Sequence, residues 1–325
     1  MSTAISISTA LTLLNLQRVG RKTAWQLADR ITHRPTGAAD LHSMLREVAV
    51  DVPRFKAPSI EDLRTASDRA ARVEEEAATC GVGVLGPSDP GFPRCLLGIP
   101  DPPFVLFYKG NGEVLNAAKA VAVIGTRSPS EAGRKAASLI SRRLADRSIV
   151  VVSGLALGCD AEAHTATVQA GGKGIAVLAH GLDTVSPASN KRLAASLLDM
   201  GGCLVSEYEC GEKAQKQHFV DRDRLQSGLS NAVVLVEAAE KSGSMHTVGF
   251  ARLQDRPIAA VSYAEQQVEA TGNRVLLGRE EATPITTLAS LEKWLAVVFP
   301  TNAETDRPKP DAVPDAIPNA DDPNF

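Results

Sequence analysis

The residues best suited to chemistry follow the apolar run Val121–Ile124, which is predicted to be a buried strand. The tripeptide Gly125–Arg127 supplies a backbone that can turn sharply, a hydroxyl and a guanidinium. Ser128 is predicted to be the N-cap of the next helix, with Pro129 first and Glu131 third in it. The open N-terminus of that helix and the guanidinium together predict a phosphate site. The alternative is an ordinary strand, turn and helix with a surface arginine.

Four later loops carry similar residues. Ligands of open parallel sheets bind outside the carboxyl ends of the strands. The loops at 153–160, 180–191, 206–207 and 237–247 follow such ends and are rich in glycine, serine and helix starts. Basic residues are expected in or near these loops, namely Arg127, Lys173, Lys191, Arg192, Arg222 and Arg224. The set predicts an extended anion or nucleotide site, and a groove over several loops suits a strand of several phosphates better than one mononucleotide.

Signatures of catalysis and of common cofactors are missing from the sequence. The first turn lacks G-x-G-x-x-G and no G-x-x-x-x-G-K-[ST] occurs, so neither a redox dinucleotide nor a P-loop site is predicted. Asp160 and His164 lie four apart on one helix, as an acid/base pair or, as we favour, as a helix cap and a core histidine. His180, in a ligand-side loop, either touches a ligand or is simply exposed. We therefore expect binding without catalysis, cofactor or metal.

The composition is that of a globular protein, with 44% hydrophobic and 22% charged residues among 325. Aromatic residues make up 4%, which disfavours a nucleic-acid surface built on many stacked rings. Because the net charge is −3, a polyanion must be held by a local patch. Five scattered cysteines, no secretory signal and no apolar run of about 18–20 residues predict a cytoplasmic protein with reduced thiols and no membrane segment.

The chain is predicted to contain three regions. Residues 1–80 form a helical domain, in which the turn at 19–22 resembles a helix-hairpin-helix or similar module. Such turns can bind a DNA backbone, but a hairpin used only for packing is the favoured interpretation. Residues 81–299 form the main domain, which the chain enters through a strand after Pro102-Pro103. Residues 300–325, an acidic and proline-rich tail, are predicted to be disordered.

Strands and helices alternate from residue 120 to residue 262. Strands are predicted at 120–124, 149–153, 174–179, 203–207, 232–237 and 257–262, and helices at 129–146, 160–170, 188–199, 221–228 and 244–254, with a last helix at 288–298. Short apolar strands joined by helices predict an α/β fold, with a parallel sheet, right-handed crossovers and helices on both faces, preceded by the small helical domain.

Residues 90–285 resemble one protein family in collinear order. The stretches that carry the resemblance include Ile124–Arg127, Ser153–Asp160, Gly171–Lys173, Gly181–Asp183, Phe219–Ser230, Val236–Ala238 and Ser242–Thr247. They are similar to the DNA processing protein A family, DprA, also called Smf. The resemblance implies an extended Rossmann-like fold, a homodimer, binding of single-stranded DNA without sequence preference, and delivery of that strand to the RecA recombinase during natural transformation. The predicted DNA- or phosphate-binding residues are Gly125, Thr126, Arg127, Ser153, Gly154, Lys173, Asn190, Lys191, Arg222, Arg224, Ser242, Gly243 and Thr247.

Several positions depart from the family pattern. Leu157 stands where the family usually has arginine, and Asp221 and Asp223 flank the two arginines of the Phe219–Arg224 stretch. The family's third-strand G-x-G reads Ala179-His180-Gly181, and no C-terminal winged helix is expected after the main domain. Lost arginine and added aspartate are expected to weaken phosphate binding, or to mark a change of ligand or partner.

Two other functions are compatible with these departures. One is a DprA-like antitoxin or regulatory component of a phage-defence or toxin–antitoxin system, whose partner would be a cognate toxin or defence effector. The other is a nucleotide phosphoribohydrolase. Its P-G-G-x-G-T-x-x-E type signature is absent, since residues 242–247 read Ser-Gly-Ser-Met-His-Thr and no glutamate follows in register.

Overall fold

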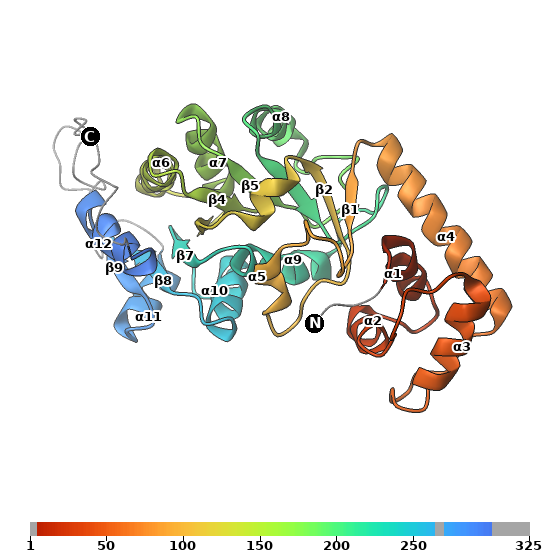
Figure 1. Cartoon of the computed structure of the whole chain (residues 1–325). Helices are drawn as coiled ribbons and strands as arrows, with labels where there is room; N and C mark the ends of the chain where they lie inside the picture. The colour runs from red at the N-terminus through yellow and green to blue at the C-terminus, as the bar shows by residue number, and fades with distance from the viewer. Residues whose placement is uncertain (1–4, 264–269, 301–325) are drawn as a thin grey trace.

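The structure is a computed structural model that describes residues 5–263 and 270–300 (Figure 1). Apart from Pro300, the tail predicted to be disordered lies outside the described residues. The strands are β1 Gly83–Leu85, β2 Leu106–Gly110, β3 Ala120–Ile124, β4 Val150–Ser153, β5 Gly174–Val177, β6 Cys203–Ser206, β7 Ala232–Leu235, β8 Ile258–Val261 and β9 Thr283–Ile285. The helices are α1 Ile7–Leu14, α2 Arg21–Ala28, α3 Ala38–Val48, α4 Ile60–Thr79, α5 Arg94–Leu97, α6 Glu131–Asp146, α7 Cys159–Gln169, α8 Lys191–Asp199, α9 Lys216–Gly228, α10 Ser244–Leu253, α11 Thr271–Gly278 and α12 Leu288–Val298, with 3-10 turns η1 Gly112–Asn116 and η2 Ala188–Asn190.

The described strands form one sheet in the order β1-β2-β6-β5-β4-β3-β7-β8-β9. Strands β3 to β9 are parallel, whereas β1 and β2 join the β6 edge in antiparallel pairs. The predicted α/β fold with a parallel sheet is therefore confirmed. From β3 the chain winds outward through β4, β5 and β6, and then continues on the other side of β3 with β7, β8 and β9. The winding direction changes beside β3, which is the place where such sheets bind ligands.

Helices cover both faces of the sheet, as expected from the alternating apolar strands (Figure 1). Val121 and Val123 face a cluster that includes Ile140 of α6 and Trp294 of α12. Ala122 and Ile124 point the other way, into a cluster with residues of α5, α9, α10 and α11. Every residue of β3 is buried, so this strand is held in place from both sides. None of the described helices combines the length and apolarity needed to cross a membrane.

Helices α1 to α4 stand at the β1 end of the sheet (Figure 1). One apolar cluster extends from these helices to Phe104, Leu197 and Leu204 of the sheet region. Trp25 meets the Phe104 ring edge to face, with centroids 5.3 Å apart. The boundary predicted at residue 80 thus separates types of secondary structure, but the apolar packing continues across it.

The turn of the α1–α2 hairpin is engaged in packing. Arg21, the first residue of α2, donates to the carboxylate of Asp101, and Trp25 Nε1 donates to the carbonyl of Pro102. These contacts fix the hairpin against the segment that leads into β2. They support the packing interpretation of this turn over binding of a DNA backbone by its amide groups.

Arg224 of α9 is the largest fully buried side chain of the described residues and is held by an ion pair. Its Nη1 and Nη2 donate to the two carboxylate oxygens of Glu207 at 2.6 and 2.7 Å, and its Nε donates to the carbonyl of Asp101 at 2.8 Å. Two charged groups in this fork geometry satisfy each other, but either one alone would be a buried charge without a partner.

We expect Arg224→Met to lower the free energy of unfolding by about 3–5 kcal/mol, because it leaves the Glu207 carboxylate unpaired. The double variant Arg224→Met with Glu207→Leu is expected to recover part of that loss. Urea denaturation followed by circular dichroism measures both. Arg192→Met, on the exposed side of α8, is the control and should change stability little. Equal stability of the Arg224 and Arg192 variants would contradict a structural role for the ion pair.

Candidate nucleic-acid interface

A cavity of about 430 Å³ opens at the carboxyl edge of the sheet, beside β3. We call it the Arg127 pocket. Its walls come from the loops after β3 and β4, from α9 and from the start of α10. The lining residues are Ile124, Gly125, Thr126, Arg127, Ala156, Asp160, Phe219, Arg222, Asp223, Gln226, Ser242, Gly243, Ser244 and Thr247. The pocket therefore lies where the winding direction of the sheet changes.

The start of α6 differs from the prediction. Its N-cap is Ser130, whose hydroxyl accepts from Gly133 N, so the prediction of Ser128 as N-cap is wrong. The carboxylate of Glu237, which follows β7, accepts from Ser130 N at 3.1 Å and from the Ser130 hydroxyl at 2.7 Å. A carboxylate of the protein itself thus occupies the positive end of this helix. The predicted phosphate site at an open α6 N-terminus is wrong for this reason.

The start of α10 is the helix N-terminus that remains open to the pocket. Its N-cap, Gly243, has no side chain to bond the first amides. The hydroxyl of Ser242 is buried and has no hydrogen-bond partner. Ser244 donates from its hydroxyl to the carbonyl of Gly125 at 2.8 Å, which joins this helix to the loop after β3. Met245 N and His246 N donate to the carbonyls of Ser242 and Gly243, so the positive end of the helix dipole and the unused Ser242 hydroxyl are what this helix start offers to an anion.

Arg127 is the exposed cation of the pocket. Its guanidinium carbon lies 5.3 Å from the centre of the Phe219 ring, in a cation–π contact. No ion pair among the described residues involves it. The guanidinium is therefore positioned by an apolar ring and keeps its donors for a ligand.

The floor of the pocket is a buried charge cluster. Arg222 Nη1 donates to the carbonyl of Val177 at 2.9 Å, and its Nε lies 3.2 Å from Asp223 Oδ1. Asp160 Oδ2 accepts from Gly154 N at 3.2 Å. A Cβ on Gly154 would lie 1.6 Å from Arg222 Nη1, so the close approach of this arginine requires glycine there. The floor holds Arg222 between two carboxylates.

Burial dominates the titration of the two carboxyl groups. It raises the pKa of Asp223 to about 7, with a further increase from Asp160, against a lowering by Arg222 and Arg127. Burial also raises the pKa of Asp160. When Arg127, Arg222, Asp160 and Asp223 are all ionised, the positive and negative charges of the pocket sum to zero. Protonation of Asp223 leaves the pocket with a net positive charge.

Asp160 and His164 do not form an acid/base pair at the pocket. The N-cap of α7 is Gly158, which has φ +77°, so the expectation that Asp160 caps this helix is wrong. Its carboxylate binds amides of the preceding loop instead. His164 is fully buried, its ring nitrogens have no hydrogen-bond partner, and burial lowers its pKa to about 4. It is a core histidine, as the favoured interpretation expected.

Seven of the thirteen predicted site residues line the Arg127 pocket, namely Gly125, Thr126, Arg127, Arg222, Ser242, Gly243 and Thr247. Two more lie beneath it. Ser153 donates from its hydroxyl to the carbonyl of Val123, and Gly154 packs against Arg222. These two support the lining residues without reaching the cavity.

The other four predicted residues lie elsewhere. Lys173 immediately precedes β5, which places it at the amino edge of the parallel sheet, opposite the pocket. Arg224 is bound to Glu207. Asn190 is buried and donates to the carbonyls of the loop at 155–156, which it braces. Lys191 begins α8 and is exposed outside the cavity.

The loops after β5 and β6 do not extend the pocket. His180 is buried, Gly181 N donates to the carbonyl of Glu212, and Gly211 N donates to the Asp183 carboxylate. These bonds tie the two loops to each other. The cavity is therefore confined to the edge at β3, β4 and β7, and the expected groove over five loops stays a prediction.

Sequence reasoning gave no site role to Phe219 and Gln226, although both line the pocket. It treated Asp223 only as a charge that weakens binding. The available signal was the register of α9, in which residues 219, 222, 223 and 226 fall on one helical face. No group of three or more histidine, cysteine, aspartate or glutamate residues in the described part of the chain has the arrangement of a metal site.

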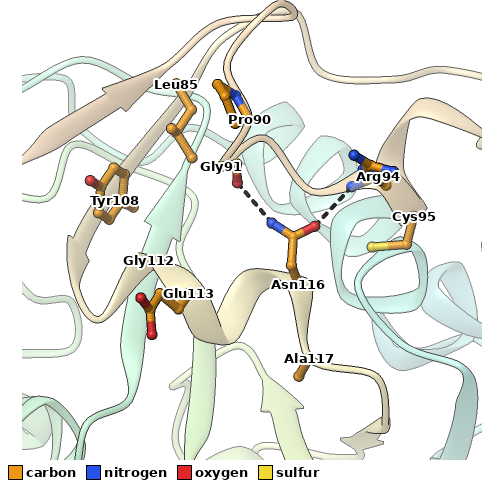
Figure 2. A pocket seen from close by; sticks show the side chains of 10 residues that line it. All are labelled: Leu85, Pro90, Gly91, Arg94, Cys95, Tyr108, Gly112, Glu113, Asn116 and Ala117. Atoms are coloured by element: carbon orange, nitrogen blue, oxygen red, sulfur yellow. Dashed lines mark hydrogen bonds between the residues drawn. The ribbon is translucent and has the colours of Figure 1, made fainter.

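A second cavity, of about 740 Å³, lies between β1, β2, α5 and η1 (Figure 2). Its central polar side chain, Asn116, donates to the carbonyl of Gly91 and accepts from Arg94 N. Figure 2 shows both hydrogen bonds, which join Asn116 to Gly91 and Arg94, with Tyr108 on the other side of the cavity. The amide is thus used to fasten the loop to η1, and this cavity is not our candidate for the functional site.

Fold and pocket together define a Rossmann-like α/β protein with a small polar pocket at the change of winding direction. The family model for DNA recombination-mediator protein A matches residues 83–295. The chain belongs to this family, also known as DprA or Smf.

Its relatives include Protein Smf of Escherichia coli, 42% identical over 178 residues, which are 54% of this chain and 47% of that protein. Among solved structures, DNA processing protein A of Streptococcus pneumoniae matches with a TM-score of 0.74 and 28% identity, over 89% of this chain and 97% of that one. The Helicobacter pylori protein, solved for its single-stranded DNA binding mode, matches with a TM-score of 0.60 and 27% identity, over 66% of this chain and 96% of that one. The chain spans about half the length of the first curated relatives that it matches.

The raised pKa of Asp223 predicts a pH-dependent stability. The folded-state pKa is about 7 and the unfolded value about 3.9, so this group's contribution is fully present below pH 4 and is lost as the pH rises through 7. Relative to Asp223→Asn, the wild type should lose stability on the order of 1–3 kcal/mol between pH 5 and pH 8. Urea denaturation across this range measures the difference. Parallel pH profiles of the two proteins would contradict a buried, titrating Asp223.

Proposed function

We propose that this protein binds single-stranded DNA through the Arg127 pocket, without catalysis, in DNA processing or recombination. The observation that carries the proposal is the convergence of Arg127, the open start of α10 and the unpartnered Ser242 hydroxyl on one cavity. A phosphate placed there would meet a guanidinium fork, the positive end of the α10 dipole and a hydroxyl. Family membership and the single-stranded DNA binding of the H. pylori relative support the same conclusion.

The shape of the pocket favours a single strand. The cavity, of about 430 Å³, is lined by α9, α10 and two loops, and we expect it to take one nucleotide unit of a strand that can splay its bases. The Arg127 guanidinium over the Phe219 ring places a cation and an aromatic side chain at its wall, both of which can contact a base. A duplex keeps its bases paired and would present only its backbone to such an opening.

The resemblance to DprA proteins supports three finer proposals. These are a homodimer in the cytoplasm, RecA as the partner that receives the strand, and a role in uptake of transforming DNA. Light scattering tests the first, and co-purification with RecA on oligo-dT tests the second. A monomer that leaves RecA unbound would restrict the function to binding DNA.

We expect Arg127→Ala to weaken binding of fluorescein-labelled oligo-dT about tenfold at 50 mM salt, since hydrogen bonds to charged groups contribute about 1.5–3 kcal/mol. The slope of log affinity against log salt should fall by about 0.7, the value for one lost phosphate contact of a single strand. Fluorescence anisotropy at several salt concentrations measures both quantities.

Arg142→Ala is the matched control for this experiment. Arg142 is an exposed arginine of α6 that does not line the pocket, so its loss changes the net charge equally. The proposal fails if both variants bind like the wild type, or if the wild type does not bind oligo-dT at low salt.

A further inference from the structure

A third cavity, of about 900 Å³, lies in the helical region. One wall is a face of α4 that runs from Asp62 to Arg72, about 15 Å at 1.5 Å per residue. The other walls are the α1–α2 turn at 15–18, with Thr23, and the segment at 53–58. We call this cavity the α4 groove. The family model starts at residue 83, so the groove lies outside the matched region.

The α4 groove is strongly basic in a protein whose net charge is −3. Arg18, Arg54, Lys56 and Arg72 line it, all four are exposed, and no ion pair among the described residues involves any of them. Arg69, which also lines the groove, is paired with Glu209 and Glu76. We therefore count four cations without a protein partner.

Opposing charge in the groove is small. Asp62 is the one carboxylate among its lining residues. Both the amide and the hydroxyl of Ser59 donate to Asp62 Oδ2, at 3.0 and 2.7 Å, in the capping box of α4. Its charge is directed at the helix start. The α4 groove therefore keeps a net positive charge, whereas in the Arg127 pocket two aspartates offset the charge of two arginines.

Two of the six described non-glycine residues with a positive φ line the groove. Arg18 and Arg54 have φ of +62° and +66°, a left-handed conformation that costs a residue with a Cβ about 1 kcal/mol or more. Both of these strained residues are arginines, and both line the same cavity from different walls. The half-buried ring of Phe55 lies between Arg54 and Lys56 in the sequence and lines the cavity as well.

We propose that the α4 groove binds the backbone of single-stranded DNA, as a contact separate from the Arg127 pocket. Three arginines and a lysine match several phosphates, and an aromatic ring among cations is the arrangement that single strands use. The proposal that the groove binds a polyanion rests on its four exposed cations that have no protein partner. The choice of DNA over an acidic peptide rests on the proposed function.

The test compares two triple variants of the full chain. Arg18, Arg54 and Arg72 are changed to alanine in the groove variant. Arg30, Arg34 and Arg46, exposed arginines of the same helical region that do not line the groove, are changed in the control. Circular dichroism establishes that both are folded. The probe is fluorescein-labelled oligo-dT, with anisotropy measured from 50 to 200 mM salt.

We expect the groove variant to bind about tenfold or more weakly at 50 mM salt, with a salt slope smaller by about 2, since each single-strand phosphate contact contributes about 0.7. The control should stay within about twofold of the wild type. Equal affinities and slopes for the groove variant and the control would overturn the proposal. So would competition by polyglutamate as effective as by unlabelled oligo-dT, because the groove would then bind acidic chains in general.

Combination with Arg127→Ala separates the two sites. If Arg127→Ala abolishes binding and the groove variant does not weaken it, the groove proposal is wrong and the pocket proposal stands. If the groove variant abolishes binding and Arg127→Ala has no effect, the pocket proposal is wrong and the groove proposal stands. Independent losses that add in the combined variant support both contacts.

Discussion

At the carboxyl edge of the sheet, carboxylates of the protein itself bind a helix start, loop amides and a buried arginine. Glu237 binds the start of α6, Asp160 binds the amides of the β4–α7 loop, and Arg222 lies between Asp160 and Asp223. Buried charges need such partners, because an unpaired charge away from water costs several kcal/mol or changes its protonation state. As a result, most of the attraction that this edge could exert on a phosphate is satisfied inside the protein. Arg127, the start of α10 and Ser242 are what remains directed at a ligand.

The extent to which the fold could be predicted is illustrated by β3 and α11. The run Val121–Ile124 is apolar on both faces, and the helices that follow it alternate with similar runs, so β3 to β8 could be predicted from hydrophobicity alone. Helix α11 was not predicted, because it contains Gly272, Asn273 and Gly278, which are poor helix formers. It is held by tertiary contacts: Asn273 Nδ2 donates to carbonyls at the ends of β7 and β8. No local pattern contains that information.

The errors in the predicted site have different causes. Lys173 precedes a parallel strand, so its place at the amino edge follows from strand direction and was available in the sequence. Arg222 and Arg224 lie two apart on α9, and residues at that spacing point to different sides of a helix. One therefore reaches the pocket and the other reaches Glu207. Glu237 could not be assigned to α6 from sequence, because the two are joined only when β7 pairs with β3.

The helical region and the pocket are mechanically connected. Leu155, one residue before Ala156 of the pocket wall, is fully buried in the same apolar cluster as Leu13 and Leu63 of the helical region. The contacts of Arg21 and Trp25 fasten the same region to the segment before β2. A strand that contacts both the pocket and the α4 groove would thus bind two surfaces at a fixed separation. The second contact is then intramolecular and gains from a high effective concentration, which compensates for a pocket whose own charges nearly cancel.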